Sequence, residues 1–293
     1  MIPHADSPLP ETEVHHLPSA HVGDMFKVLV GHCGSLRAAD ARVLFMGDPW
    51  ANFGTAVEMA RLLRYSEDIP PLLIVAVGYD LVTIDDNAAV RSRDFTPTID
   101  RTRGGDDPAM MGGAGRFLTF LRDELKPWVR ERYGVDPDDS AFFGDSLGGL
   151  FAMWTLLTEP GLFPRYGIGS PSLWWDDSMM FGQEAAYASA HDDLPATVFV
   201  SVGELETPAG DVRWREQLPP ERRAKAEADA EAEARVGPPV DMVADAARMV
   251  AALRSRAYPS LDIAFEVLPG EYHHTAPSLN LSRALRYLFD APR

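Results

Sequence analysis

Short apolar runs alternate along the chain with segments in which apolar residues recur every three or four positions. The runs are typical of strands in a sheet that is covered on both faces, and the recurring positions are typical of amphipathic helices. The expected strands lie at 26–30, 43–46, 72–77, 141–143, 166–168, 198–202 and 263–268, with an eighth near 13–17. The alternation predicts an α/β protein with a mainly parallel eight-stranded sheet and helices on both faces.

The expected helices differ in how much of their surface is apolar. One stripe of apolar side chains recurs from Phe117 to Val129, and Pro127 should kink or divide that helix. Residues 150–157 are apolar on nearly every side, as in a helix buried against a sheet. Two more amphipathic helices are expected around 242–253 and 281–289.

One charged segment interrupts this pattern. Residues 221–235 read ERRAKAEADAEAEAR, which contains strong helix formers but no apolar side chain larger than alanine. Proline pairs at 219–220 and 238–239 bracket it. We expect a solvated helix, within a charged helical insertion near 213–239 that is a candidate lid. No domain boundary is evident, so residues 1–293 are expected to form a single domain, with 1–20 as an N-terminal extension or edge strand.

Composition narrows the class of protein. Hydrophobic residues make up 46% of the chain and charged residues 24%, which fits a soluble globular protein. No apolar run approaches the roughly 18 residues that a membrane span needs. The start, MIPHADSPLPETEV, lacks the basic and apolar regions of a secretory signal, so a cytoplasmic location is expected. The net charge of −17 disfavours nucleic-acid partners. Cys33 is the single cysteine and is expected to be a small buried residue.

A candidate nucleophile lies in the stretch AFFGDSLGGL at 141–150. Gly144, Ser146 and Gly148 form G-x-S-x-G between an apolar strand and an apolar helix. This setting is that of a nucleophile elbow, a sharp turn that raises the serine hydroxyl above the sheet. The flanking glycines are expected to remove Cβ atoms that would clash, and the amide of Leu147 is expected to stabilise an oxyanion at the helix N-terminus. The alternative is an ordinary glycine-rich turn.

A serine hydroxyl needs a base and an orienting acid. In folds built around a nucleophile elbow, the acid follows the serine in the chain and the histidine follows the acid. Two neighbouring histidines, His273 and His274, follow the last expected strand. Two glutamates, Glu204 and Glu206, follow the strand before it. Neighbouring side chains on such a turn cannot both face one imidazole, so one glutamate should be a solvated bystander; we favour Glu206 as the acid.

Several stretches together resemble the esterase D-like putative esterase family, and within it the enterochelin-type siderophore esterases. The resemblance extends from about residue 26 to 289 and implies the α/β-hydrolase fold. It also implies His273 as the base and Glu206 as the acid, although some such esterases are described with a Ser-His dyad. The stretches are RSRDFTPT at 91–98, AFFGDSLGGLFA at 141–152, GSPSLWWDD at 169–177, SVGELE at 201–206 and LPGEYHHT at 268–275.

The same resemblance implies a second oxyanion donor. In such relatives it is the amide that follows an L-D-G stretch, and alignment on Gly47 makes Asp48 the donor here. Met46 stands where the family usually has Asp, and Pro49 has no N–H to donate.

Three tryptophans lie just beyond expected strand ends, where α/β sheets place their ligands. Trp50, Trp174 and Trp175 are candidates for the walls of a substrate pocket, and two of the three are expected to line it. Arg91 and Arg93 would either orient an anionic substrate or form structural ion pairs with Asp94 or Asp106.

These observations predict a serine hydrolase that cleaves a carboxylic ester or lactone through an acyl-enzyme, with a siderophore or other natural-product ester as a candidate substrate. The alternatives are an acyltransferase with the same Ser-His machinery and a non-catalytic binding protein on a hydrolase scaffold. The sequence has no H-E-x-x-H, P-loop or G-x-G-x-x-G motif, so no metal and no cofactor are expected. The expected partner is a small-molecule ester or lactone, without nucleic acid or membrane, and the oligomeric state is left open.

Overall fold

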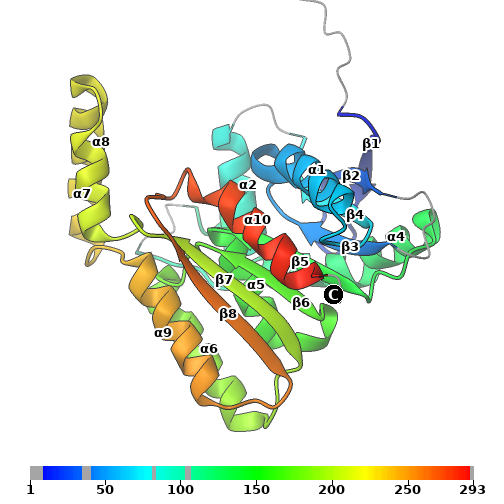
Figure 1. The fold of residues 1–293 in the computed structure, drawn as a ribbon. Coiled ribbons are helices and arrows are strands. Elements are labelled where there is room, and N and C mark those ends of the chain that lie inside the picture. Colours follow the sequence, from blue (N-terminus) through cyan, green and yellow to red (C-terminus); the bar gives the residue numbers. More distant parts are fainter. Residues whose placement is uncertain (1–8, 35–40, 81–83, 103–106, 291–293) are drawn as a thin grey trace, which may run out of the picture.

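The strands form one eight-stranded sheet with the order β1-β2-β4-β3-β5-β6-β7-β8 (Figure 1). The computed structural model describes residues 9–34, 41–80, 84–102 and 107–290. β2 pairs antiparallel with β1 and β4, and the other neighbours pair parallel, which confirms the mainly parallel sheet. The strands are β1 Thr12–Pro18, β2 Met25–Cys33, β3 Arg42–Met46, β4 Leu72–Gly78, β5 Ser140–Asp145, β6 Arg165–Gly169, β7 Ala196–Gly203 and β8 Leu261–Leu268.

Burial along the strands follows their place in the sheet. Every residue of β4 and β5 is buried, because these central strands are covered on both faces and consist of continuous apolar runs. In the edge strand β1, half-buried and exposed residues alternate along most of its length. Cys33, at the end of β2, is 1% exposed as expected, and burial raises the pKa of its thiol to about 12.

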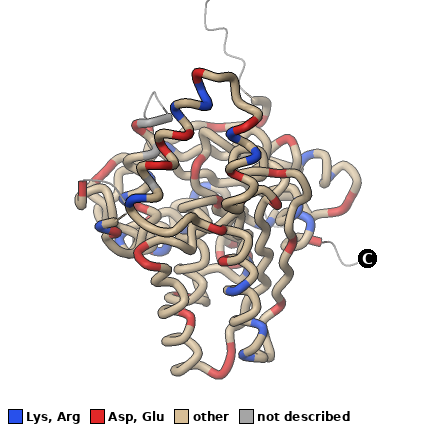
Figure 2. The backbone as a smooth tube through the Cα atoms, turned by 90° about the vertical axis from the view of Figure 1, so that its left-hand side faces the viewer, with Lys and Arg blue, Asp and Glu red and all other residues tan. Residues whose placement is uncertain are grey.

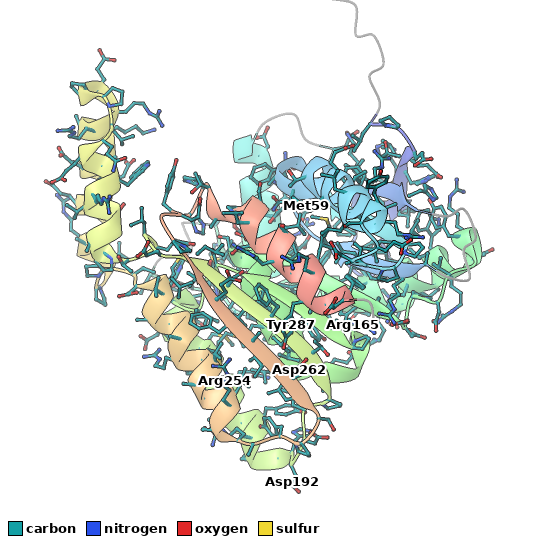
Figure 3. All side chains as sticks on the ribbon, viewed as in Figure 1. Met59, Arg165, Asp192, Arg254, Asp262 and Tyr287 are labelled. Carbon is teal, nitrogen blue, oxygen red and sulfur yellow. The ribbon has the colours of Figure 1, made fainter. Side chains whose placement is uncertain are left out.

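Helices cover both faces of the sheet, as predicted (Figure 1). One face packs against α1 and α10, and the other packs mainly against α5 and α9, with α6 and α2 behind them. Figure 3 shows Met59 of α1 beside α10, and the Ser282 hydroxyl of α10 contacts its sulfur at 3.7 Å. These helices are α1 Pro49–Tyr65, α2 Ile84–Phe95, α5 Leu147–Thr158, α6 Trp175–Ala190, α9 Met242–Ser255 and α10 Ala276–Phe289, and short 3-10 turns lie at Pro108–Met110 and Pro160–Leu162.

The helical stretch around Pro127 is divided, as its sequence predicts. It consists of α3 (Ala114–Phe120), a π-helical turn (Leu121–Leu125) and α4 (Lys126–Tyr133). Pro127 lies in the first turn of α4, where its missing N–H costs least.

The charged segment forms a helix that stands clear of the sheet. Figure 1 shows α8 (Pro220–Val236) projecting from the body of the molecule beyond α7 (Pro208–Glu216). Its side chains are mostly exposed, which confirms the expected solvated helix.

Figure 2 shows Lys and Arg interspersed with Asp and Glu along the coloured part of the backbone. None of the helices in the described ranges is both long and apolar enough to cross a membrane.

Candidate active site

Ser146 lies on a sharp turn between β5 and α5. Its backbone has φ 59° and ψ −119°, a conformation that non-glycine residues rarely adopt and that is typical of a nucleophile elbow. A Cβ atom on Gly144 would lie 2.1 Å from the Gly148 carbonyl oxygen, so glycine is required there. The expected clash at Gly148 is wrong, because a Cβ atom there would meet its nearest neighbour at an ordinary 3.6 Å. The tight position is Gly149, whose Cβ would lie 2.6 Å from the Gly169 carbonyl oxygen.

Two loops at the carboxyl ends of neighbouring strands bring an imidazole and a carboxylate to the serine. His273, after β8, has its Nε2 atom 3.1 Å from the Ser146 Oγ. Its Nδ1 atom lies 2.6 Å from Oε2 of Glu206, which follows β7. If Nδ1 carries the proton and donates it to the carboxylate, Nε2 is free to accept the serine proton. The arrangement is therefore suited to general-base activation of a nucleophile.

The two residues left open as alternatives lie elsewhere. Glu204 accepts a hydrogen bond from the Gly270 amide at 2.7 Å, and so it braces the loop that leads to His273. The His274 side chain is exposed, with its ring centroid 5.7 Å from that of His273. The structure thus brings together the favoured pair, His273 and Glu206.

The charges around His273 favour its protonated form. Burial lowers the pKa of the imidazole, but the hydrogen bond and charge of Glu206, with the charge of Asp145, outweigh it and raise the pKa above its usual value. Asp145 immediately precedes the serine, and burial raises the pKa of its carboxyl to about 6. An imidazolium formed when His273 accepts a proton would therefore be stabilised by two nearby carboxylates.

The two expected oxyanion donors lie at helix N-termini. Leu147 is the first residue of α5, and Asp48 immediately precedes α1. Asp48 is held in the left-handed conformation, with φ 50° and ψ 53°. Helix N-termini present amide N–H groups and a partial positive charge, so both positions suit the stabilisation of a negative oxygen.

Arg91 links the loops that carry these two amides. Its guanidinium donates to both carboxylate oxygens of Asp48, at 2.7 and 2.6 Å. The same guanidinium donates to the Asp145 carbonyl oxygen at 3.3 Å, next to Ser146. Arg91 therefore forms a structural ion pair, but with Asp48 and not with the expected Asp94, because a sequence gives no sign of a pair 43 positions apart.

Arg93 forms a structural ion pair with Asp94, which is one of the alternatives expected from the sequence. Its guanidinium donates two hydrogen bonds to the Asp94 carboxylate, at 2.8 and 2.9 Å. Asp106, the other expected partner, lies outside the described residues.

The three tryptophans occupy different environments. Trp175 is 2% exposed and belongs to the core, where its indole N–H donates to the Thr98 hydroxyl at 3.3 Å. Trp174 is partly buried, and Trp50 is 48% exposed on the first turn of α1. Trp50 and Trp174 thus remain the candidates for a pocket wall.

Two residues near the site were not singled out by the sequence. The Ser172 hydroxyl lies 3.4 Å from the Ser146 hydroxyl, and the Ser170 hydroxyl donates to Oε1 of Glu206 at 2.5 Å. Both lie in the stretch GSPSLWWDD, which marked the segment but not the hydroxyl groups. Among the described residues, no group of three or more His, Cys, Asp or Glu side chains is placed to hold a metal ion.

Comparison with known proteins identifies the family of this chain. The model of the Esterase family, described as "Putative esterase", matches residues 30–236. The chain belongs to this esterase family. The resemblance inferred from the sequence motifs is therefore confirmed, and the fold is that of the α/β-hydrolases.

Several relatives within the family have named substrates. The chain is 30% identical over 210 residues to the ferri-bacillibactin esterase BesA of Bacillus subtilis, which covers 68% of this chain and 72% of the relative. It is 31% identical over 256 residues to the siderophore triacetylfusarinine C esterase of Aspergillus fumigatus, covering 85% of this chain and 81% of the relative.

Solved structures show the same fold over nearly the whole chain. The siderophore hydrolase EstB from Aspergillus nidulans superposes with a TM-score of 0.77 at 25% identity, covering 98% of both chains. The BES protein from Bacillus cereus superposes with a TM-score of 0.76 at 24% identity, covering 97% of both chains, and supports the fold alone.

Proposed function

We propose that this protein is a serine hydrolase that cleaves a carboxylic ester or lactone of a siderophore through an acyl-enzyme intermediate. The observation that supports it best is the continuous chain of contacts from Ser146 through His273 to Glu206, with distances of 3.1 and 2.6 Å. Such a chain joins a nucleophile, a base and an orienting acid. The strained turn at Ser146 also supports the proposal, because nucleophile elbows of this kind expose a serine hydroxyl to the substrate carbonyl.

In the proposed acylation step, the Ser146 Oγ attacks the ester carbonyl carbon while Nε2 of His273 takes the hydroxyl proton. The carbonyl electron pair moves to its oxygen, and the amides of Leu147 and Asp48 stabilise that oxyanion. The bond to the leaving alcohol then breaks, and His273 returns the proton to the alcohol oxygen. Glu206 stabilises the imidazolium between these two transfers.

Deacylation repeats the sequence with water as the nucleophile. His273 takes a proton from water, whose oxygen attacks the acyl carbon of the Ser146 ester. The tetrahedral intermediate collapses, Ser146 recovers its proton from His273, and the carboxylic acid leaves.

The substrate class follows from the named relatives. The relative from Aspergillus fumigatus is named a siderophore esterase, the relative from Bacillus subtilis is named an esterase of ferri-bacillibactin, and the bond that an esterase breaks is an ester. Trp50 and Trp174 supply flat apolar surfaces for the aryl or acyl parts of such a molecule.

The nucleophile is tested by labelling with a fluorophosphonate probe and locating the adduct by mass spectrometry. We expect a single adduct on Ser146 and none on the folded Ser146→Ala variant. A folded wild-type protein that acquires no label would contradict the serine mechanism. Release of p-nitrophenol from butyrate esters, with and without an added alcohol, then distinguishes hydrolysis from acyl transfer.

The projecting helix α8 lies between Glu206 and His273 in the chain. We propose that the segment acts as a lid. Deleting residues 220–236 should change the preference between short and long acyl esters while shifting the melting temperature by only a few degrees, since few contacts tie α8 to the core. An unchanged preference would contradict a lid.

A further inference from the structure

A buried polar network lies behind the candidate acid, on the side away from His273. Its side chains come from the ends of three strands and from α10, and each is at most 8% exposed. Buried polar groups are stable only when they are hydrogen-bonded, so the connections within this network constrain its geometry. The members are Asp145, Ser170, Ser201, Glu206 and Asn280.

Asn280 forms hydrogen bonds with three other members. Its amide nitrogen donates to the Asp145 Oδ2 atom at 2.7 Å and to the Ser170 Oγ atom at 3.1 Å. Its amide oxygen accepts the Ser201 hydroxyl proton at 2.7 Å. The opposite amide orientation would place this oxygen against the Asp145 carboxyl and leave Ser170 without its donor, so the orientation is fixed.

The fixed amide determines where the Ser170 proton points. Ser170 has one hydroxyl proton, and Asn280 already donates to its oxygen, so that proton goes to Oε1 of Glu206, 2.5 Å away. The Gly203 amide donates to the same oxygen at 2.7 Å. With two donors on Oε1, the carboxylate cannot rotate freely, and Oε2 is held toward His273.

The packing leaves Asn280 little freedom to move. A Cβ atom on Gly169 would lie 2.2 Å from the Asp145 Oδ2 and 2.8 Å from the Asn280 Nδ2, so the space around this contact is full. At the other end of α10, the Tyr287 hydroxyl donates to Asp262 of β8 at 2.6 Å, and both are labelled in Figure 3. The helix that carries Asn280 is therefore fixed to the sheet that carries Glu206.

We propose that Asn280 is a positioning residue for the catalytic acid, which acts through Ser170 to hold the Glu206 carboxylate toward His273. The inference rests on the proposed role of Glu206. It assigns a function in catalysis to a residue of the last helix that touches neither the nucleophile nor the base.

A double-mutant cycle tests the proposal, with p-nitrophenyl butyrate as the substrate. Asn280→Ala and Ser170→Ala are each made in the wild-type protein and in Glu206→Gln. We expect each to lower kcat/KM about tenfold in the wild-type background and less than about twofold in Glu206→Gln, because residues that act through one group are not additive. Leu285→Ala, a buried position one turn along α10 and outside the network, is the control and should have the same small effect in both backgrounds.

The outcomes separate this inference from the proposed function. Equal losses in both backgrounds would show that Asn280 supports the fold alone and would overturn the inference. A Glu206→Gln variant with wild-type kcat would overturn the triad assignment and the inference with it. If Asn280→Ala does not fold, as judged by circular dichroism, the Ser170→Ala cycle decides the question, because Ser170 is the group through which the effect passes.

Discussion

Two buried carboxylates flank Ser146, and they have opposite kinds of partner. Asp48 follows β3 on one side of β5, and Glu206 follows β7 on the other. Each residue is 7% exposed. Asp48 is paired with the guanidinium of Arg91, whereas Glu206 is paired with the imidazole of His273.

The difference lies in whether the partner can titrate. A guanidinium stays protonated at every pH at which the protein is folded, so the Asp48–Arg91 pair has a constant charge and suits a fixed loop. An imidazole gains and loses its proton near neutrality, so the Glu206–His273 pair can change its charge during turnover. The two carboxylates thus illustrate two uses of a buried ion pair, one to hold geometry and one to stabilise a charge that forms and disappears.

The largest expected effect is at the titrating pair. Glu206→Gln should lower kcat about 1,000-fold or more, because the amide no longer favours the tautomer that leaves Nε2 free for the serine. Steady-state hydrolysis of p-nitrophenyl butyrate by the wild-type protein and the variant measures this loss of kcat. Glu204→Gln is the matched comparison and should lose far less, since Glu204 only braces the Gly270 amide. A larger loss in Glu204→Gln would move the acid assignment to that residue.

Breaking the Asp48–Arg91 pair should lower kcat less than breaking the Glu206–His273 pair. Arg91→Met removes the bonds that join the Asp48 loop to the elbow and should lower kcat about 100-fold, as expected for a misplaced oxyanion donor. The loss should be equal for neutral and anionic esters. A loss confined to anionic esters would show that Arg91 binds substrate instead. Arg165→Met, at the start of β6, breaks the ion pair of Arg165 with Asp139 and controls for the loss of a partly buried arginine.

The pH dependence should distinguish the two pairs directly. The proposed mechanism needs neutral His273, and the pKa of this imidazole is raised, so kcat/KM should rise with pH through a midpoint above the usual pKa of histidine. Glu206→Gln removes the main interaction that raises this pKa, and the midpoint should fall. Asp48→Asn should leave the midpoint near the wild-type value. An equal shift of the kcat/KM midpoint in both variants would contradict this difference between the two pairs.

The smallest expected effect concerns stability at Asp145. Burial raises the pKa of this carboxyl to about 6, above the usual value near 4, so the folded state holds its proton more tightly than the unfolded state. This contribution to stability is full at low pH and is lost as the pH rises to about 6. Asp145→Asn should therefore raise the melting temperature more at pH 8 than at pH 4.5, as thermal unfolding at the two pH values can show. A greater gain at the lower pH would contradict the burial argument.

Local patterns were enough to identify most of the catalytic candidates. The elbow at Ser146 depends on a strand, a turn and a helix that are contiguous in sequence, and the order of strands placed a glutamate and a histidine after it. The details that local patterns missed depended on distant segments. Gly149 approaches the backbone of Gly169, whereas Gly148 meets only side chains at ordinary distances. Which of the three tryptophans lies in the core was also set by a distant segment, because Thr98 and Asp100 bond to Trp175 and its neighbour Asp176.

The sequence alone therefore predicted the sheet and the elbow, because hydrophobic periodicity and turn geometry act over a few residues. The choice of His273 over its neighbour His274 came from the resemblance to a known family. Only the tertiary structure decided how the two carboxylates are held. Asp48 meets Arg91 across 43 positions, and Glu206 meets His273 across 67. Such bonds form when packed layers bring distant polar groups together in the interior, where each buried donor and acceptor must find a partner.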